Sequence, residues 1–364
     1  MKLVDRLVLR EMIGPFLFGV AAFASIFFAG RDLLRIISDV VKGLPVWAAG
    51  ELLALHLPSI IVMVLPMAAL LGVLLSFSRL SGDSEIAALY CGGVSLYRIV
   101  TAALALGFAV SALTFVLNEI VVPRANLRSR EIRAQMLKEE MAIEKPVPLA
   151  DIKDGVTNSI VYVQGGIDRE ARVLRDVSIV LFRGNRPRAF FFARRARWEG
   201  AYKWRLYEGY WQSLASGPGG LVVTQTFRVW KTDVRLRHTP EELETFSRKP
   251  DELSFSELLT HIRRLDARGA PTTEEELDLY NKISLPLAAF VFAVLASSLG
   301  LRSHRGGSSV GLGLSVLIII VYWIIWHFTS AIAGQGAIHP LLGSFSASVL
   351  TLALGFALLV RAAR

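Results

Sequence analysis

Residues 79–95 read RLSGDSEIAALYCGGVS and form a short polar break between two long apolar runs. The break contains a short helical pattern that follows Asp83, carries Glu85 in its first turn and stops at Gly92-Gly93. Asp83 is a favourable helix N-cap, and a carboxylate such as that of Glu85 suits the positive end of the helix dipole. A plain loop between two membrane spans needs no such helix. The pattern therefore predicts a docking surface for a soluble partner at the membrane face.

An alternative interpretation of this stretch is an interfacial helix that lies on the bilayer and contacts no protein. Its apolar positions, Ile86, Ala87 and Leu89-Tyr90, are too few for strong anchoring in lipid. We therefore favour docking.

Six apolar stretches approach the roughly 20 residues that an α-helix needs to cross a hydrocarbon core. Together with 53% hydrophobic residues and a mean hydropathy of +0.48, they exclude an ordinary soluble enzyme. Pro58, Pro66 and Pro286 fall inside these stretches and are expected to kink their helices without preventing insertion. The predicted spans cover residues 12–34, 52–77, 98–120, 283–301, 308–331 and 341–360.

The Lys and Arg residues of the short loops predict the orientation of the spans, because basic residues are retained on the cytoplasmic side. Both termini and the polar break are expected to be cytoplasmic, which places residues 124–281 outside. The basic residues that carry this prediction are Lys2, Arg6, Arg10, Arg79, Arg98, Arg302, Arg305, Arg361 and Arg364.

Charge and cysteine content narrow the possible functions further. A net charge of +9 is compatible with nucleic-acid binding, but anionic lipid explains it more simply in a membrane protein. Cys91 is the only cysteine, so the outer region is expected to fold without a disulfide.

Ala22-Phe23-Ala24 resembles a signal-peptide cleavage site, but the apolar run from Ile13 to Gly30 is longer than such a segment requires. We therefore expect the first span to be retained.

The region between the third and fourth spans differs in composition from the rest of the chain. A charged helical pattern covers residues 124–144, and short runs of branched and aromatic residues follow. Gly-containing turn signals separate these runs, which is typical of an antiparallel sandwich or roll. The predicted strands are SIVYV (159–163), VSIVLF (177–182), RAFFFAR (188–194), KWRLYEGYW (203–211) and LVVTQTFRVW (221–230).

Two helices are predicted to follow these strands. The first covers residues 254–268, because Ser254 and Glu257 have the spacing of a capping box and Gly269 marks its end. Residues 274–276 are three glutamates that begin a second helix, which we expect to continue into the fourth span. The apolar face of the first helix consists of Phe255, Leu258, Leu259, Ile262 and Leu265.

The sequence contains no recognisable motif for catalysis. A Gly-rich loop ending in Gly-Lys-Ser or Gly-Lys-Thr is missing, so any ATP that drives this protein is hydrolysed by another chain. The six histidines show no metal-ligand spacing with Cys, Asp or Glu. His56 and His327 fall in spans, where an ionisable group is a functional candidate, although a neutral, hydrogen-bonded histidine between helices is the simpler interpretation. A membrane-embedded enzyme is therefore disfavoured, and no cofactor is expected.

Three basic residues, Arg31, Arg35 and Lys42, cluster where the first span is expected to leave the outer leaflet. Arg31 and Arg35 share a face by their four-residue spacing, and guanidinium groups at this depth suit the phosphate or carboxylate of a lipid head group. Snorkelling combined with pairing to Asp32 and Asp39 explains the same residues equally well. The sequence leaves both interpretations open.

Several stretches together resemble the LptF/LptG (YjgP/YjgQ) permeases of the lipopolysaccharide export ABC transporter. The most specific stretch is RLSGDSEIAALYCGGVS (79–95), and the similarity extends over nearly the whole chain. The other similar stretches are LVDRLVLREMIGPFLFG (3–19), VMVLPMAALLGVLLSFS (62–78), LNEIVVPRAN (117–126), LSFSELLTHIRRLDARG (253–269) and LYNKISLPLAAFVFAVLASSLGLRS (279–303).

The resemblance implies an inner-membrane subunit with six transmembrane helices and an inserted periplasmic antiparallel β-jellyroll. Residues 1–123 would hold helices one to three, residues 124–270 the β-jellyroll with its trailing helix, and residues 271–364 helices four to six. Lipopolysaccharide would leave the outer leaflet through a lateral opening lined by spans one and five. The implied partners are a cytoplasmic dimer of LptB-like ATPases, a homologous LptF/LptG-like permease in a heterodimer or homodimer, and an LptC/LptA-like periplasmic jellyroll bridge.

The resemblance also assigns roles to individual residues. It places the family's coupling helix on residues 83–93, and the candidates for coupling to the ATPase are Arg79, Asp83, Ser84, Glu85, Ala88, Leu89 and Gly92. The candidates for contact with the lipid head group are Arg31, Arg35, Lys42 and Lys282. The alternative function is a membrane sensor or mechanotransmitting subunit whose outer β-domain binds a ligand. A sensor usually carries a cytoplasmic effector domain, and the expected cytoplasmic parts are only short loops and tails.

Overall fold

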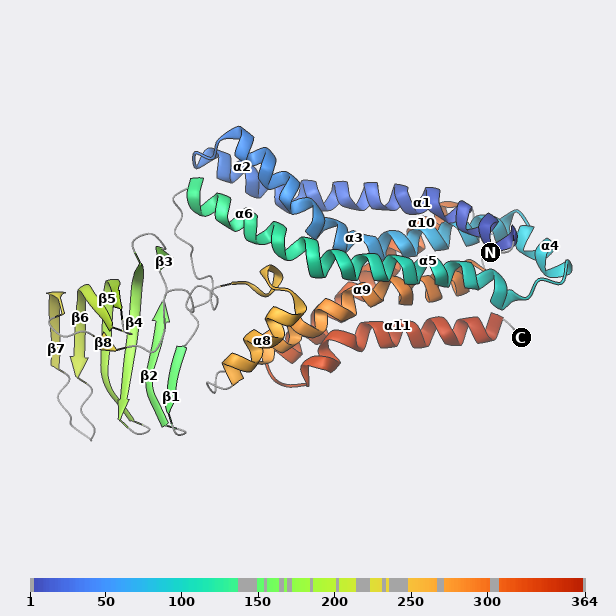
Figure 1. Ribbon diagram of the computed structural model, residues 1–364. Coiled ribbons are helices and arrows are strands. Elements are labelled where there is room, and N and C mark those ends of the chain that lie inside the picture. The colour runs from blue at the N-terminus through green and yellow to red at the C-terminus, as the bar shows by residue number, and fades with distance from the viewer. Residues whose placement is uncertain are drawn as a thin grey trace. The chain divides into compact units, whose positions relative to one another are not determined.

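The computed structural model describes residues 3–136, 149–153, 156–163, 167–168, 172–183, 186–200, 203–213, 223–230, 234–235, 248–266, 272–301 and 308–362. The chain divides into two compact units. One consists of Met1–Ser129 with Thr273–Arg364, and the other of Arg130–Thr272. Figure 1 shows long helices in the first, which we call the helical unit, and a sheet in the second, which we call the β unit.

The described residues of the helical unit contain six helices that are long and apolar enough to cross a membrane, as predicted. Each begins earlier or ends later than the apolar stretch that predicted it, because polar turns extend the helices beyond their hydrophobic segments. The first and third spans continue through short π-helical segments, η1 (Phe28–Asp32) and η2 (Leu117–Val121), into further α-helix. The helices of this unit are α1 (Leu3–Phe27), α2 (Leu33–Val41), α3 (Val46–Gly82), α4 (Glu85–Cys91), α5 (Leu96–Val116), α9 (Thr273–Gly300), α10 (Ser308–Gly334) and α11 (Pro340–Ala362), together with α6 (Val122–Met136) as far as Ser129.

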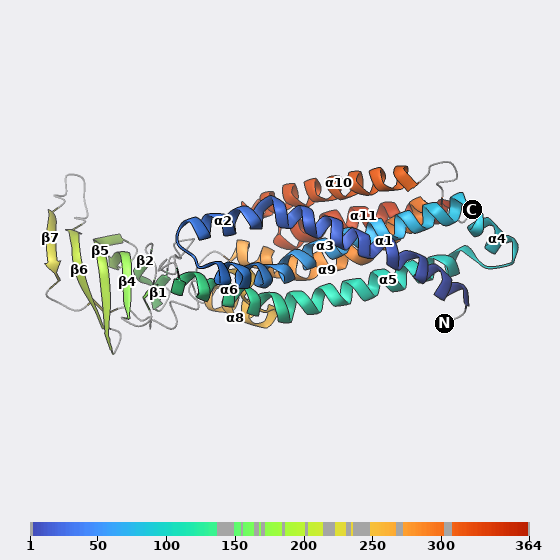
Figure 2. The same cartoon turned by 90° about the horizontal axis from the view of Figure 1, so that it is seen from above.

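The two ends of the helical unit differ in what they contain. Figures 1 and 2 place the start of α1, the end of α11 and the short helix α4 at the same end. This arrangement is the one that six membrane crossings require, because an even number of crossings returns the chain to the side on which it began. The predicted helix that begins at Glu274 is also confirmed, since α9 runs unbroken into the fourth span.

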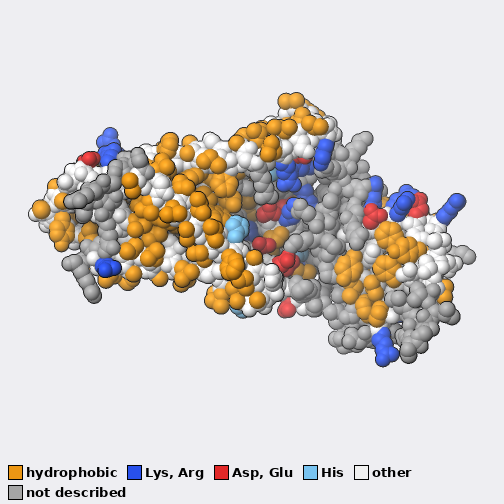
Figure 3. All heavy atoms as spheres, turned by 180° about the vertical axis from the view of Figure 1, so that it is seen from behind, with side chains coloured by type: hydrophobic (Ala, Val, Ile, Leu, Met, Phe, Trp, Pro, Cys, Tyr) orange, Lys and Arg blue, Asp and Glu red, His pale blue; other side chains and the backbone are white. Residues whose placement is uncertain are grey.

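Close approach between the helices depends on small residues. A Cβ atom on Gly107 of α5 would lie 2.5 Å from the Cβ of Ala293 on α9. A Cβ on Gly300 of α9 would likewise collide with Phe77 of α3. Small residues that let backbones approach are the usual means by which helices associate in lipid. Hydrophobic side chains cover much of the visible outer surface of this unit (Figure 3).

The β unit contains eight strands in its described residues, all in one antiparallel sheet. The main order is β1-β2-β4-β5-β6-β7, with β3 beside β4 and β8 beside β6. The antiparallel β-domain and all five predicted strands are confirmed, whereas the short strands β1, β3 and β8 were not predicted. The bounds are β1 (Leu149–Lys153), β2 (Val156–Val163), β3 (Ile167–Asp168), β4 (Val173–Arg183), β5 (Arg186–Gly200), β6 (Lys203–Ser213), β7 (Val223–Val229) and β8 (Val234–Arg235).

A row of irregular residues crosses β4, β5 and β6. Asp176 and Glu208 have positive φ angles of 47° and 52°, and by register both lie opposite Arg194. Along β5 every second residue is buried up to Ala193, and the next buried residue is Ala196. The buried residues therefore have odd numbers before this row and an even number after it. The shift keeps both parts of the sheet directed at one core, as in a rolled sheet.

That core lies on one face of the sheet and is rich in aromatic residues. Trp204 is completely buried, and Phe191 contacts Trp230 with ring centroids 5.1 Å apart. Phe190 and Phe192 alternate with Phe191 along β5 and pack on Tyr210 on the opposite face. The aromatic residues of β5 therefore lie on both faces of the sheet, Phe191 on the face that bears the core and Phe190 and Phe192 on the other.

Helix α8 (Phe255–Asp266) follows the strands and confirms the predicted capping box. The backbone N–H of Ser254 donates to Glu257 Oε2 at 2.8 Å, and the N–H of Glu257 donates to Ser254 Oγ at 3.3 Å. Its predicted apolar face is also confirmed, since Leu258, Ile262 and Leu265 are buried. The predicted helix end at Gly269 and residues 137–144 of the predicted charged helix lie outside the described residues.

A buried ion pair fixes the segment before α8. Arg130 Nη1 lies 2.7 Å from Glu252 Oε2, in the short 3₁₀ helix η3 (Pro250–Glu252). Burial raises the pKa of the Glu252 carboxyl above its usual value, and Arg130 opposes this rise. Because the pKa of Glu252 is higher in the folded state, its carboxyl makes its full contribution to the free energy of unfolding at pH values below its pKa in the unfolded chain. This contribution is lost as the pH rises through the pKa of the folded protein.

Candidate functional site

Helix α4 is the first part of the candidate site, and its C-terminal end is built as predicted. The N–H of Val94 donates to the carbonyl of Leu89 at 3.0 Å, and the N–H of Gly93 donates to that of Tyr90 at 3.0 Å. Gly93 has a φ of +81°, the left-handed conformation that glycine adopts without strain. These bonds form a Schellman motif, which stops the helix at Gly92-Gly93.

The prediction that Asp83 caps α4 is wrong. Helix α3 continues to Gly82, and the N–H of Asp83 donates to the Arg79 carbonyl at 2.9 Å. Ser84 occupies the N-cap position with a φ of 60° and makes no side-chain capping bond. The turn between the helices is so tight that Asp83 belongs to the end of α3, and its carboxylate lies 3.9 Å from Arg79 Nε.

One face of α4 packs on the helical unit and the other is open. Ile86 is 8% exposed and belongs to the same core as Leu80 and Ile99, and Leu89 packs at the edge of that core. Glu85 and Tyr90 are exposed. Of the predicted coupling residues, Arg79, Asp83, Ser84, Glu85, Ala88 and Gly92 are exposed and Leu89 is half-buried. Their exposure leaves them accessible to a partner, and their role in coupling stays a prediction.

Two acidic residues that the sequence interpretation missed lie at this end. Glu11 Oε2 of α1 is 2.7 Å from Arg79 Nη2, and Asp5 Oδ1 is 3.8 Å from Arg98 Nε at the start of α5. The only signal in the sequence is a pair of carboxylates within an otherwise basic first turn and apolar span. Nothing in the sequence indicates which arginine each would meet.

The predicted head-group residues fall into different environments. Arg35 and Lys42 are exposed on α2 and directly after it, whereas Lys282 on α9 is 6% exposed. The backbone of Arg31 lies in η1, and its side chain is outside the described residues. A single surface shared by all four therefore stays a prediction.

The two histidines in spans have different surroundings. His56 Nε2 on α3 is 3.3 Å from Ser129 Oγ on α6, which confirms a hydrogen-bonded histidine between helices. His327 is exposed on α10 and packs against the rings of Trp323 and Trp326, so the same interpretation is wrong for it. Among the described residues, no group of three His, Cys, Asp or Glu could hold a metal ion.

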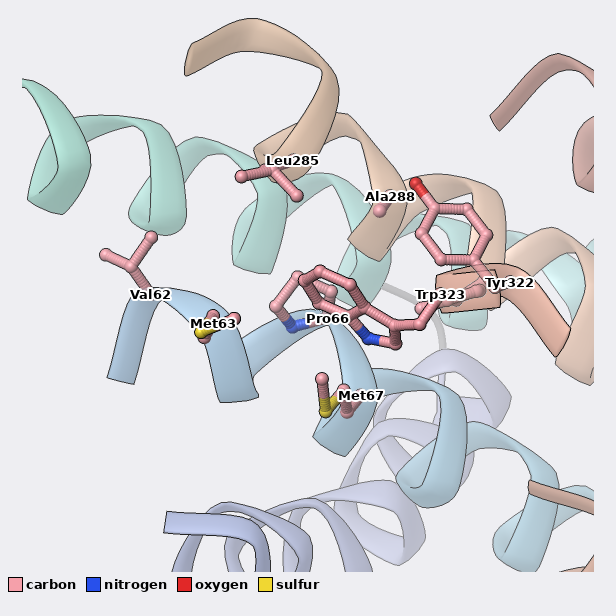
Figure 4. Close-up of a pocket in the computed structure, with 9 residues that line it drawn as sticks. Val62, Met63, Pro66, Met67, Leu285, Ala288, Tyr322 and Trp323 are labelled. Atoms are coloured by element: carbon pink, nitrogen blue, oxygen red, sulfur yellow. The ribbon is translucent and has the colours of Figure 1, made fainter. Parts of the chain in front are cut away.

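A small apolar crevice lies between α3, α9 and α10 (Figure 4). Tyr322 contributes its ring, and its hydroxyl is paired with Ser348 Oγ of α11 at 3.0 Å. The crevice therefore offers an apolar surface, suited to hydrocarbon rather than to a charged ligand. Its lining consists of Val62, Met63, Pro66, Met67, Leu285, Ala288, Phe292, Tyr322 and Trp323.

These features define a multi-pass membrane protein: six membrane-length helices, a β-domain inserted after the third, and a short, partly exposed helix between the second and third. Residues 6–361 match the family model described as lipopolysaccharide export system permease LptF/LptG. The chain therefore belongs to this family, and the resemblance seen in its sequence is confirmed.

Two curated relatives are lipopolysaccharide export system permease proteins LptG. The protein of Escherichia coli (strain K12) is 27% identical over 320 residues, which cover 86% of this chain and 85% of the relative. The protein of Haemophilus influenzae (strain ATCC 51907 / DSM 11121 / KW20 / Rd) is 26% identical over 300 residues, covering 80% and 79%.

Proposed function

We propose that this chain is an inner-membrane permease that extracts lipopolysaccharide from the outer leaflet and is driven through α4 by a partner ATPase. The match of residues 6–361 to a family described by lipopolysaccharide export carries the proposal. Because both relatives named above are LptG proteins, we assign this chain the G-type role beside an F-type permease. Both termini and α4 face the cytoplasm in this proposal, and the β unit lies in the periplasm.

The exposed surface of α4 supports a motor in another chain. A partner that hydrolyses ATP needs a rigid element to push, and α4 is fixed by Ile86 on one side and open around Glu85 on the other. An LptB-like ATPase dimer would dock on this face, and its movement would pass to the membrane helices.

The bare faces of two spans support pairing with a second permease. In the most apolar stretch of the first span only 11% of the residues are buried, and in that of α10 only 22% are. In the proposed complex these two spans line the lateral opening, where a lipid enters between the permeases. The apolar crevice beside α10 would receive part of an acyl chain, each buried methylene contributing about 0.8 kcal/mol.

The head-group and bridge functions complete the proposal. Arg31, Arg35, Lys42 and Lys282 would contact phosphate or carboxylate groups of the lipid, and the β unit would pass the lipid to an LptC/LptA-like jellyroll. Charge reversal of Arg31 and Arg35 should weaken capture of lipopolysaccharide while the protein still folds. Unchanged capture would remove these two residues from the proposed contact.

The experiment that tests the function uses the chain co-expressed with its candidate ATPase and second permease, reconstituted in liposomes containing lipopolysaccharide. We expect ATP-dependent release of the lipid to a periplasmic acceptor. Glu85→Lys should lower release at least about fivefold while the ATPase still co-purifies. Asp266→Lys, on the exposed end of α8, is the control and should change nothing. A complex that contains no ATP-binding protein, or that releases no lipid with ATP, would contradict the proposal.

A further inference from the structure

We propose that two cross-helix ion pairs, Glu11 with Arg79 and Asp5 with Arg98, clamp the N-terminal half of α1 to the helices on either side of α4. In this role Asp5 and Glu11 are positioning residues that make α1 move together with the coupling helix. The inference rests on the proposed function, because it concerns how a movement of α4 reaches the first span.

The positions of the two arginines in the chain make the clamp possible. Arg79 lies in the last turn of α3 and Arg98 in the first turn of α5, so the two arginines bracket α4. Both pair with α1, at 2.7 Å through Glu11 and at 3.8 Å through Asp5. The two carboxylates are six residues apart, or about 9 Å along the helix axis. Two attachment points separated in this way resist sliding and rotation of α1 together.

Tight packing lies between the two attachment points. Val8 and Met12 are 1% and 0% exposed and share a core with Ile86 of α4. Ser76 Oγ donates to the backbone carbonyl of Glu11 at 3.0 Å. A Cβ atom on Gly72 would lie 2.9 Å from Phe16 Cβ, so α1 and α3 are in close contact one turn further on. An isolated surface ion pair contributes little, but these pairs flank a packed interface.

The C-terminal half of α1 contrasts with the clamped half. Leu17, Phe18 and Ile26 are 58%, 58% and 64% exposed, and the π-helical segment η1 follows. One side of this half still packs on α3, since a Cβ atom on Gly19 would lie 3.0 Å from Leu71 Cδ2, whereas its other side is open. A push on α4 would move the clamped end of α1, and the C-terminal half with its open side would move with it beside the lateral opening.

The first test measures lipid released per ATP hydrolysed by the reconstituted full complex. It uses Asp5→Arg, Arg98→Asp and the double variant that restores the pair with reversed charge. We expect each single variant to lower this ratio about fivefold and the double variant to return to within about twofold of the original. Arg10→Asp is the control, because Arg10 is exposed on the same helix as Asp5 and its substitution changes the net charge by as much as Arg98→Asp does.

Two outcomes would overturn the clamp. One is a ratio in the single variants that stays within about twofold of the original, and the other is a double variant no better than either single. If the unchanged complex releases no lipid with ATP, the proposed function fails, and the distance measurement described next still tests the clamp.

The second test measures a distance and does not depend on transport. Cys91 is the only cysteine and is exposed at the end of α4, so it accepts a spin label directly. A second label is placed on α1 by Arg6→Cys, at an exposed position. The clamp predicts one distance that is the same in nucleotide-free and ATP-trapped complexes, and a broader distribution after Asp5→Arg. If the distance between the two labels changes with nucleotide while Asp5 and Arg98 are unsubstituted, the clamp is overturned.

Discussion

The central helices α3 and α9 and the peripheral helices α1 and α10 are similarly apolar but differ in what covers them. The most apolar stretches of α3 and α9 have mean hydropathies of 2.7 and 2.0, and those of α1 and α10 have values of 2.0 and 2.1. Nevertheless, 83% and 72% of the residues in the stretches of α3 and α9 are buried, against only 11% and 22% in those of α1 and α10. Hydropathy therefore shows that a helix enters the membrane and does not show whether it faces protein or lipid. In lipid the distinction comes from shape, through small residues that allow close contact.

This difference separates a packed scaffold from helix faces that the rest of the chain leaves uncovered. Gly107 and Gly300 bring α9 against α5 and α3, so these helices share one packed core. The exposed residues of α1 and α10 are available to lipid or to a second permease. The following predictions test this division, beginning with the largest expected effect.

Phe77→Ala should destabilise the helical unit most. Phe77 is 0% exposed on α3, and removing a buried aromatic ring typically costs about 3–5 kcal/mol. Phe328→Ala on α10 is the matched control, because Phe328 is 67% exposed and its loss should cost less than about 0.5 kcal/mol. Thermal unfolding of the purified chain in detergent measures both. Equal losses of stability would mean that α3 and α10 are not distinguished by packing.

Gly107→Leu should have the next largest effect. The added side chain would meet Ala293 and the backbone of α9, and overpacking of this kind costs about 1–3 kcal/mol. Gly313→Leu on α10 is the control, since no atom lies within 4 Å of a Cβ at that position. The same unfolding assay applies. A stable Gly107→Leu variant would show that α5 and α9 can separate at little cost.

Phe18→Ala tests the peripheral helix α1 as an interface with a second permease. Phe18 is 58% exposed, so stability of the isolated chain should not change, whereas loss of an interface aromatic weakens binding by about 1–2 kcal/mol. Recovery of the second permease in a pull-down under dilute conditions measures the effect. Phe108→Ala on α5, at 68% exposed, serves as the comparison and should leave recovery unchanged. Equal losses from the two would remove the special role of α1.

Ser348→Ala should produce the smallest change. It removes the hydrogen-bond partner of Tyr322, a polar contact that holds α10 against α11, and one such bond contributes about 1 kcal/mol. Ser25→Ala is the control, because Ser25 is exposed and bonds only within α1. A shift in the unfolding temperature larger than that of Gly107→Leu would mean that polar contacts dominate the attachment of α10.

Local patterns predicted much of the fold. The six spans follow from runs of apolar residues, and α8 follows from the Ser254–Glu257 capping box and its apolar face. The five longer strands follow from branched and aromatic composition. These signals are contained within a few neighbouring residues, so no knowledge of distant contacts is needed.

The features that were missed depend on residues far apart in the chain. Asp83 was expected to cap α4, but the continuation of α3 places it at the end of that helix. The partners of Asp5 and Glu11 are set by how α1 lies against α3 and α5. His327 has the same type of sequence surroundings as His56, and only the packing of α10 shows that it is exposed.

The side of the membrane that α4 faces decides whether an ATPase can reach it. Cys91 is the only cysteine of the chain and is exposed, so a membrane-impermeant maleimide reports its side without any substitution. If α4 faces the cytoplasm, Cys91 is labelled in inverted inner-membrane vesicles and not in intact spheroplasts. Labelling in spheroplasts would place α4 in the periplasm, beyond the reach of any ATPase, and would overturn the proposed function.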